Sequence, residues 1–184
     1  MIENDSFPNT YKSLETEYLI TVYSQGYTRL IKSVKGLSLE EMRKSMIPDK
    51  WTISEILMHV VDSEIMGYCR INQTITQSDR LFAFYNQDTW TEVFNYNIYP
   101  KDIIDNRLIL FEHLRNAIVY TFQNLPADDW NKTGRHPERG DITLRNLLEL
   151  YADHCERHID QILQRRVILG KAINLKPVLE NRLY

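Results

Sequence analysis

Residues 150–162 read LYADHCERHIDQI and contain two histidines, His154 and His158, four positions apart. On a helix, this spacing places both side chains on one face, with their Cβ atoms roughly 5–6 Å apart. Two imidazoles at that separation can bind one metal ion, and neutral imidazole is the commonest metal ligand in proteins. The pair by itself does not establish a metal site, because two core histidines can also be satisfied by hydrogen bonds.

A helical wheel of the segment after Thr143 indicates where these two rings point. The apolar residues form one arc, and both histidines fall at the edge of that arc. An imidazole in this position costs free energy unless it has a polar partner. Cys155 falls near the middle of the arc, which predicts a core residue and not a nucleophile. The acids Asp153 and Glu156 fall on the opposite side and are predicted to face solvent.

A third metal ligand must come from elsewhere among the five histidines of the chain. His59, in KWTISEILMHVVDSE, shares a narrow polar stripe with Arg70 on an otherwise apolar helix, and this stripe is either a solvent face or one wall of a site. His113 falls outside the apolar face of its helix and is predicted to face solvent. His136 lies in the sequence HPERG, where it either approaches the site or solvates a turn. His59 is therefore the best third candidate.

The elements that must position these residues are helices. Apolar spacing predicts them over about residues 14–34, 52–77, 103–122 and 144–169, and Thr52 with Glu55 has the pattern of a capping box. No segment shows convincing strand alternation, so the predicted class is all-α. The link from 78 to 102 is rich in aromatic residues, which we expect to pin it onto the bundle or to line a pocket mouth. At roughly 3.3 Å per residue it can run the full length of a bundle, so the second and third helices can be parallel.

Length and composition narrow the classes of protein. With 184 residues the chain suits one domain, which we place over 1–184. A net charge of −3 argues against a nucleic-acid partner. The sequence contains no apolar run long enough for a membrane span and does not begin like a signal peptide. Its two cysteines are too few for a disulfide framework, so a reducing, cytoplasmic setting is expected.

Three stretches together resemble the DinB-like superfamily, close to its YfiT-like branch. They are KWTISEILMHVVDSE, the aromatic link with Gln87-Asp88-Thr89-Trp90, and HPERGDITLRNLLELYADHCERHIDQI. The resemblance covers most of the chain. It implies a four-helix bundle of up-down-down-up type that binds one divalent ion, most often zinc or nickel. It also implies that His59, His154 and His158 are the ligands, and that a homodimer is common.

The reaction is less closely specified by this resemblance. Relatives include S-transferases and isomerases that use bacillithiol, mycothiol or glutathione, and others named metal-dependent hydrolases. Three protein nitrogens leave an open coordination position, as in catalytic sites. We therefore expect an ion that activates a low-molecular-weight thiol, which attacks a small electrophile. The alternatives are a hydrolase that uses metal-bound hydroxide and a non-enzymatic bundle that binds a metal or a ligand.

Further residues are candidates for contacts around such an ion. Ligating imidazoles donate their other N–H to an acceptor, and Asp62 and Gln161 lie three positions after a histidine. For Asp62, a solvated surface position is the favoured alternative. Arg107 falls within the apolar face of its helix, where it either binds a carboxylate of the thiol cosubstrate or extends from the bundle end to solvent. Arg70 is a second candidate contact for the cosubstrate.

Overall fold

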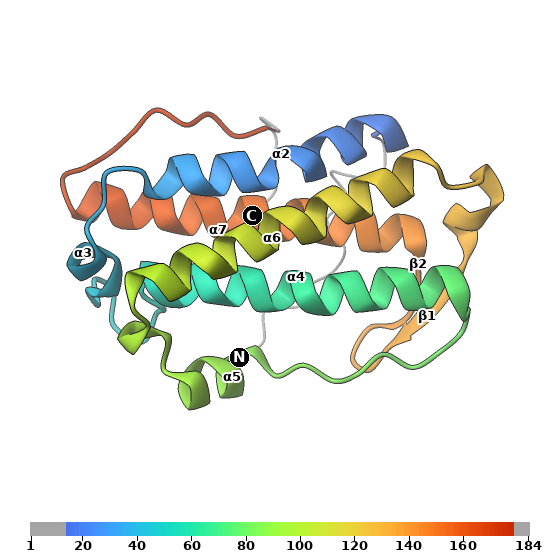
Figure 1. The fold of residues 1–184 in the computed structure, drawn as a ribbon, viewed down its shortest axis with the longest axis horizontal. Coiled ribbons are helices and arrows are strands. Elements are labelled where there is room, and N and C mark those ends of the chain that lie inside the picture. The colour runs from blue at the N-terminus through green and yellow to red at the C-terminus, as the bar shows by residue number, and fades with distance from the viewer. Residues whose placement is uncertain (1–13, 179–184) are drawn as a thin grey trace.

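The computed structural model describes residues 14–178, in which four long helices lie side by side (Figure 1). They are α2 (Thr16–Val34), α4 (Ile53–Thr76), α6 (Lys101–Gln123) and α7 (Leu144–Ile168). All four predicted helices are confirmed, with small shifts at their ends. Among the described residues, no helix has the length and hydropathy that crossing a bilayer requires. That one domain covers residues 1–184 stays a prediction.

The helices follow an up-down-down-up order. The colour gradient of Figure 1 shows that α2 and α7 run in one direction, whereas α4 and α6 run in the other. Both α2 and α4 pack against α6 and α7. Helices α2 and α4 therefore lie diagonally across the bundle from each other, and so do α6 and α7. The predicted fold class, with parallel second and third helices, is confirmed.

A long crossover makes the parallel pair possible. It follows α4 and contains α5 (Gln87–Phe94) and η1 (Tyr96–Ile98). Figure 1 shows it running back along the bundle beneath α4. Phe82 and Tyr96 are buried in the two apolar clusters of the core, whereas Phe84 stays exposed. Burial of these two rings attaches the crossover to the helices, as predicted for its aromatic residues.

The starts of α4 and α7 are fixed by side-chain caps. The Thr52 hydroxyl accepts from the Glu55 backbone N–H at 3.2 Å, and the Glu55 carboxylate accepts from the Thr52 N–H at 2.7 Å. Thr143 caps α7 in the same way with Asn146. A third capping box at Ser38 opens the short helix α3 (Leu39–Arg43). Because such caps satisfy the free N–H groups of a first turn, each helix begins at a defined residue.

One short hairpin, which no strand alternation in the sequence indicated, accompanies the helices. After η2 (Ala127–Asn131), β1 (Thr133–His136) pairs antiparallel with β2 (Gly140–Thr143). Each strand has four residues, too few to show an alternating pattern in the sequence, and the hairpin closes with Gly140 at φ +74°. The Phe82 N–H donates to the Arg135 carbonyl at 2.9 Å, so that the hairpin also holds the start of the crossover.

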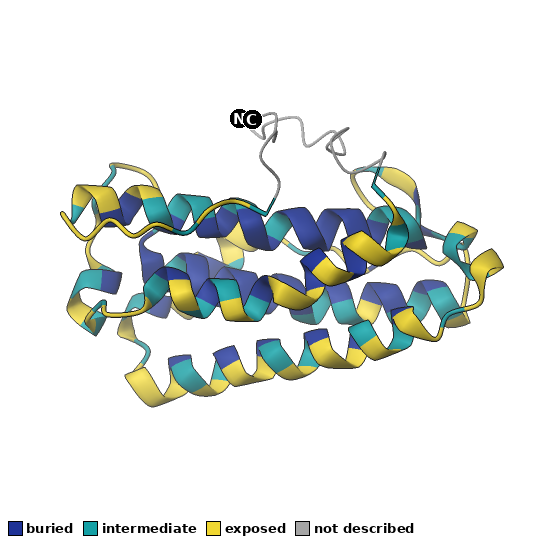
Figure 2. Ribbon diagram, turned by 90° about the horizontal axis from the view of Figure 1, so that it is seen from above, coloured by how far each residue is buried: buried dark blue, intermediate teal, exposed yellow. Residues whose placement is uncertain are grey.

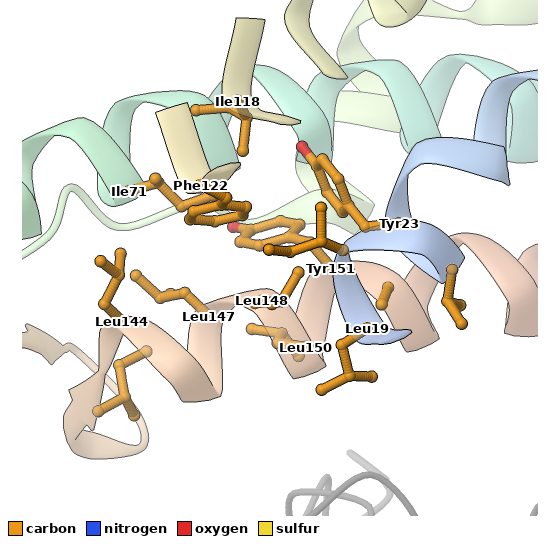
Figure 3. Close-up of a cluster of buried hydrophobic side chains, with 14 of the residues drawn as sticks. Leu19, Tyr23, Ile71, Ile118, Phe122, Leu144, Leu147, Leu148, Leu150 and Tyr151 are labelled. Carbon is orange, nitrogen blue, oxygen red and sulfur yellow. The ribbon is translucent and has the colours of Figure 1, made fainter. Parts of the chain in front are cut away.

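The core consists of two apolar clusters along the bundle. Figure 3 shows one of them, in which side chains of all four long helices meet around Tyr23, Phe122 and Tyr151. The other cluster includes Leu57 and Phe111 and continues toward the opposite end of the bundle. Buried residues follow the inward faces of the helices and exposed residues their outer faces (Figure 2). The histidine-bearing segments of α4 and α7 are thereby held by rigid packing on both sides.

The acids of α7 are an exception to this pattern, and the prediction for them is wrong. Asp153 and Glu156 are only 3% and 1% exposed. Arg29 of α2 forms a bidentate pair with Glu156, at 2.5 and 2.7 Å, and Arg157 pairs with Asp153 at 2.7 Å. Arg29 also donates to the Lys176 carbonyl, which belongs to the segment after α7. Neighbouring chain therefore covers the polar face of α7, which a wheel of one helix cannot show.

Candidate metal centre

Three histidines converge between α4 and α7. The Nε2 atom of His154 lies 3.0 Å from that of His59 and 3.1 Å from that of His158. One potential ligand atom from each ring lies within 4.8 Å of the other two. Since α4 and α7 are antiparallel neighbours, residues far apart in the sequence meet at one level of the bundle. The structure thus brings together the three residues proposed as ligands.

The rings are enclosed by aromatic side chains. His59 is 1% and His158 8% exposed, and His154 is half-buried. The Trp51 ring, just before the cap of α4, lies 4.7 Å from the His59 ring and 6.3 Å from the His158 ring. Tyr85 of the crossover stacks parallel to His59 at 6.2 Å between ring centroids. The crossover therefore contributes one wall of the site, which agrees with the second role expected for its aromatic residues.

Outer hydrogen bonds fix the orientation of two of the rings. The Gln161 side-chain oxygen lies 3.0 Å from His158 Nδ1, as predicted, and as an acceptor it calls for a proton on that nitrogen. The Tyr85 hydroxyl, and not Asp62, is the partner of His59 Nδ1, at 3.1 Å. With a proton on each Nδ1, both rings direct an Nε2 lone pair toward the centre of the cluster. This is the tautomer of histidines that bind a metal through Nε2.

The cluster fits a divalent ion. Zinc binds histidine nitrogens at about 2.0–2.1 Å in tetrahedral geometry, which places two ligand atoms about 3.3 Å apart. The observed separations of 3.0 and 3.1 Å are close to this value. Burial and the charge of the neighbouring His158 lower the pKa of His59 and of His154 well below the usual value. Both rings are therefore neutral near pH 7, the state in which histidine binds metals.

Asp62 is buried, contrary to the expectation of a solvated surface position. It is 2% exposed and accepts hydrogen bonds from the Tyr96 hydroxyl and the Arg107 guanidinium. Burial raises its pKa even though both donors favour the ionised form. The ion pair holds the inner end of Arg107, whose side chain is 26% exposed. That Arg107 also contacts a substrate stays a prediction.

The remaining candidates lie outside the cluster. His113 is exposed on α6, as predicted. His136 is buried in β1, where its Nδ1 accepts from the Glu138 N–H at 3.2 Å. Cys155 is a core residue, as predicted: it is fully buried beside the Gly26 carbonyl, and burial raises the pKa of its thiol to about 12. Arg70 is buried near the hairpin end of α4.

Sequence reasoning missed a buried ion pair in the middle of the bundle. Arg115 of α6 donates to Glu64 of α4 at 2.9 and 3.1 Å, and the Tyr23 hydroxyl donates to the same carboxylate. A Cβ at Gly26 would lie 2.1 Å from the Arg115 guanidinium, so only glycine leaves room for it. The position of Arg115 on the apolar face of its helix was an available signal. Tyr85 gave none, because it lies in an irregular link where apolar spacing has no period.

Comparison with known proteins agrees with this architecture. The model of the DinB superfamily matches residues 23–162. A Bacillus cereus protein named "putative metal-dependent hydrolase" is 29% identical over 161 residues, which are 85% of this chain and 91% of that protein. A protein of the same description from Oceanobacillus iheyensis is 30% identical over 73% of this chain and 76% of its own length.

Solved structures support the same assignment of the fold. YfiT from Bacillus subtilis, described as a probable metal-dependent hydrolase with an unusual four-helix bundle topology, superposes with a TM-score of 0.79 at 21% identity. The match covers 86% of this chain and 91% of that one. A mycothiol-dependent maleylpyruvate isomerase gives 0.66 at 15% identity, over 84% of this chain and 63% of the other. The chain belongs to the DinB superfamily and has the YfiT-like four-helix-bundle fold.

Proposed function

We propose that this protein is a divalent-metal-dependent enzyme whose ion is held by His59, His154 and His158. The observation that carries the proposal is the convergence of three Nε2 atoms, two of them on rings whose Nδ1 is bonded outward. Three imidazole ligands without a carboxylate leave the charge of the ion uncompensated and at least one position open. That arrangement is typical of catalytic metal sites.

The chemistry follows from the open position. A bound divalent ion lowers the pKa of a water or thiol that reaches it, which makes a nucleophile available near neutral pH. Residues of the chain hold the ligands in place: Gln161 and Tyr85 contact the outer nitrogens of two rings, and the Trp51 ring packs beside His59. Asp62 is the carboxylate nearest to His59 in the sequence. It already accepts hydrogen bonds from the Arg107 guanidinium and the Tyr96 hydroxyl.

In the proposed reaction, the thiolate sulfur of a low-molecular-weight thiol, of bacillithiol type, attacks a small electrophile: a sulfur–carbon bond forms, the bond to the leaving group of the electrophile breaks, and the thiol proton passes to water. The engagement of Asp62 favours this reaction over hydrolysis, because hydrolysis benefits from a free carboxylate as general base. The mycothiol dependence of one structural neighbour also supports it. Hydrolysis is the second candidate, and the names of the sequence relatives favour it.

The test is a turnover screen on metal-loaded protein. Bacillithiol, mycothiol and glutathione are each offered with a fluorogenic chlorobimane, and ester and amide substrates are offered in parallel. We expect turnover with a thiol that His154→Ala abolishes and His113→Ala retains, since His113 is exposed on α6. Turnover of esters or amides alone would replace thiol transfer by hydrolysis. Absence of any activity in protein that binds its metal would favour the non-enzymatic alternative.

The finer expectations remain proposals. Zinc or nickel is the expected ion, and metal quantification on purified protein decides between them. The homodimer, the cytoplasmic location and the substrate contacts of Arg107 and Arg70 are likewise predictions. Sedimentation of the full-length protein measures whether it is a homodimer.

A further inference from the structure

Arg70 is a buried arginine whose charge has no acidic partner. Its side chain lies near the hairpin end of α4 and is 7% exposed. Nη1 donates to the Tyr151 hydroxyl at 3.2 Å, and Nη2 donates to the Ala83 carbonyl at 3.3 Å. Its Nε is buried without a partner, and no carboxylate in the described chain forms an ion pair with Arg70. Burial of an uncompensated charge is costly and calls for an explanation.

The other fully enclosed arginines have either a carboxylate partner or several backbone acceptors. Arg115 has the carboxylate of Glu64. Arg165 donates to the carbonyls of Trp51 and Gln161, and Arg166 donates to several backbone carbonyls at the end of the bundle. Arg70 has no carboxylate either, donates to a single backbone carbonyl and lies over the Phe82 ring at 5.7 Å; it differs from these three in its Nε, which is buried without an acceptor.

Two more donors lie beside Arg70. The Tyr151 hydroxyl accepts from Arg70, so its own proton is available to another group. His136 is 8% exposed and accepts from the Glu138 N–H at Nδ1, which places the proton of its neutral ring on Nε2. That Nε2–H has no partner among residues 14–178. His136 follows Arg135, whose carbonyl accepts from the Phe82 N–H, and Arg70 lies over the Phe82 ring at 5.7 Å, so the two groups belong to one neighbourhood. Burial, and after it the charge of Arg70, lowers the His136 pKa to about 4, so this ring stays neutral.

Both contacts of Arg70 are with residues close in sequence to residues of the candidate metal centre. Tyr151 precedes His154 by three residues on α7, which is about 4.5 Å along the helix axis. On the other side, Ala83 and Tyr85 are neighbours in the crossover, and the Tyr85 hydroxyl contacts His59. Along α4, Arg70 follows His59 by eleven residues, which is about 16.5 Å or three helical turns, whereas the Tyr151 hydroxyl that it contacts belongs to a residue one turn from His154.

We propose that Arg70, with the Tyr151 hydroxyl and His136 Nε2–H, binds an oxyanion, a carboxylate or phosphate group, of the small molecule that reacts at the three-histidine centre. That the other end of this small molecule reacts at the three histidines rests on the proposed function. The anion site itself is inferred only from the hydrogen-bond donors of Arg70, Tyr151 and His136. Arg107 is the weaker candidate for this role because Asp62 already neutralises it.

The first experiment measures the stabilisation of the full-length, metal-loaded protein by simple anions. Thermal and urea unfolding are recorded in sodium acetate, sodium phosphate and sodium chloride at equal ionic strength. An anion at ten times its dissociation constant lowers the unfolding equilibrium constant about elevenfold. We expect this response to acetate or phosphate in the wild type, and its loss in Arg70→Met, which keeps the apolar stem. The anion that stabilises the protein more identifies carboxylate or phosphate as the ligand group.

The matched control is Arg135→Met, beside His136 in the hairpin, since Arg135 is exposed and pairs with Asp141 at 2.9 Å. It should keep the anion response. His136→Asn retains an acceptor for the Glu138 N–H but removes the Nε2 donor, and we expect it to weaken the response severalfold. Arg70→Met should fold as well as the wild type without anions, because it removes an unpaired buried charge.

Two results would overturn the proposal. One is an equal anion response in wild type and Arg70→Met, as expected if the anions bound the metal ion or acted only as general stabilising salts. The other is no response in the wild type at any concentration below the range of general salt effects. Because these measurements need no turnover, a failed thiol screen with an intact anion response would remove the proposed reaction and leave the site.

Discussion

Removal of His154 should separate the metal-dependent part of stability from the rest. Its Nε2 lies between the other two, within 3.1 Å of each. His154→Ala therefore leaves only two imidazole ligands, His59 and His158, for the ion. An ion that binds only the folded state, at a thousand times its dissociation constant, adds about 4.1 kcal/mol. For a chain of this size, each kcal/mol shifts the midpoint of thermal unfolding by about 2–4 °C. Metal should therefore raise the wild-type midpoint by about 8–16 °C.

The variant should retain only a small part of this shift. A hundredfold loss of affinity leaves the same ion at ten times its dissociation constant, which corresponds to about 1.4 kcal/mol or 3–6 °C. Calorimetry with and without zinc or nickel, together with metal quantification, measures both values. Because each protein is compared with its own metal-free form, a loss of packing in the variant cancels. The control is His113→Ala, which is exposed on α6 and should behave as wild type. Equal metal content and equal shifts in wild type and His154→Ala would refute the three-histidine site.

Three further predictions follow from individual contacts. Tyr85→Phe removes the partner of His59 Nδ1 and should weaken metal binding about 10–100-fold, measured by competition with a chelator. Glu64→Gln leaves Arg115 buried without its counter-charge and should cost about 3–5 kcal/mol in urea unfolding. His136 has a pKa lowered to about 4, mainly by burial, whereas the unfolded side chain titrates near 6.5. The unfolded state therefore binds the proton first as the pH falls, and this histidine should cost about 2 kcal/mol of stability between pH 7 and pH 5.

Each of these has a matched control and a contradicting outcome. Tyr120→Phe alters a 71% exposed tyrosine and should keep full metal affinity; equal losses in both variants would remove the special role of Tyr85. Asp105→Asn breaks an exposed ion pair with Lys101 and should cost below about 1 kcal/mol. A similarly small cost for Glu64→Gln would mean that the buried pair is not needed. His136→Asn should show a flatter stability profile between pH 7 and pH 5, and an unchanged slope would assign that slope to other groups.

Much of the fold could be predicted because its signals are local. Four long apolar repeats, threonine caps and few glycines or prolines specify helices without reference to the rest of the chain. The spacing of His154 and His158 likewise places both rings on one face of α7 before any neighbour is considered. The hairpin escaped prediction because its four-residue strands are stabilised by pairing with each other and with the crossover, and not by a periodic pattern.

The surroundings of the site were decided by tertiary contacts. Periodicity indicates which face of a helix is apolar, but it does not indicate what covers the polar face. Asp153 and Glu156 were therefore assigned to solvent, although Arg29 and other chain segments enclose them. Tyr85 reaches His59 only because the crossover returns along α4, a contact between an irregular link and a helix. The sequence by itself determined the helices and the candidate ligands. The tertiary structure decided their partners, because hydrogen bonds and ion pairs between distant segments depend on how the helices pack.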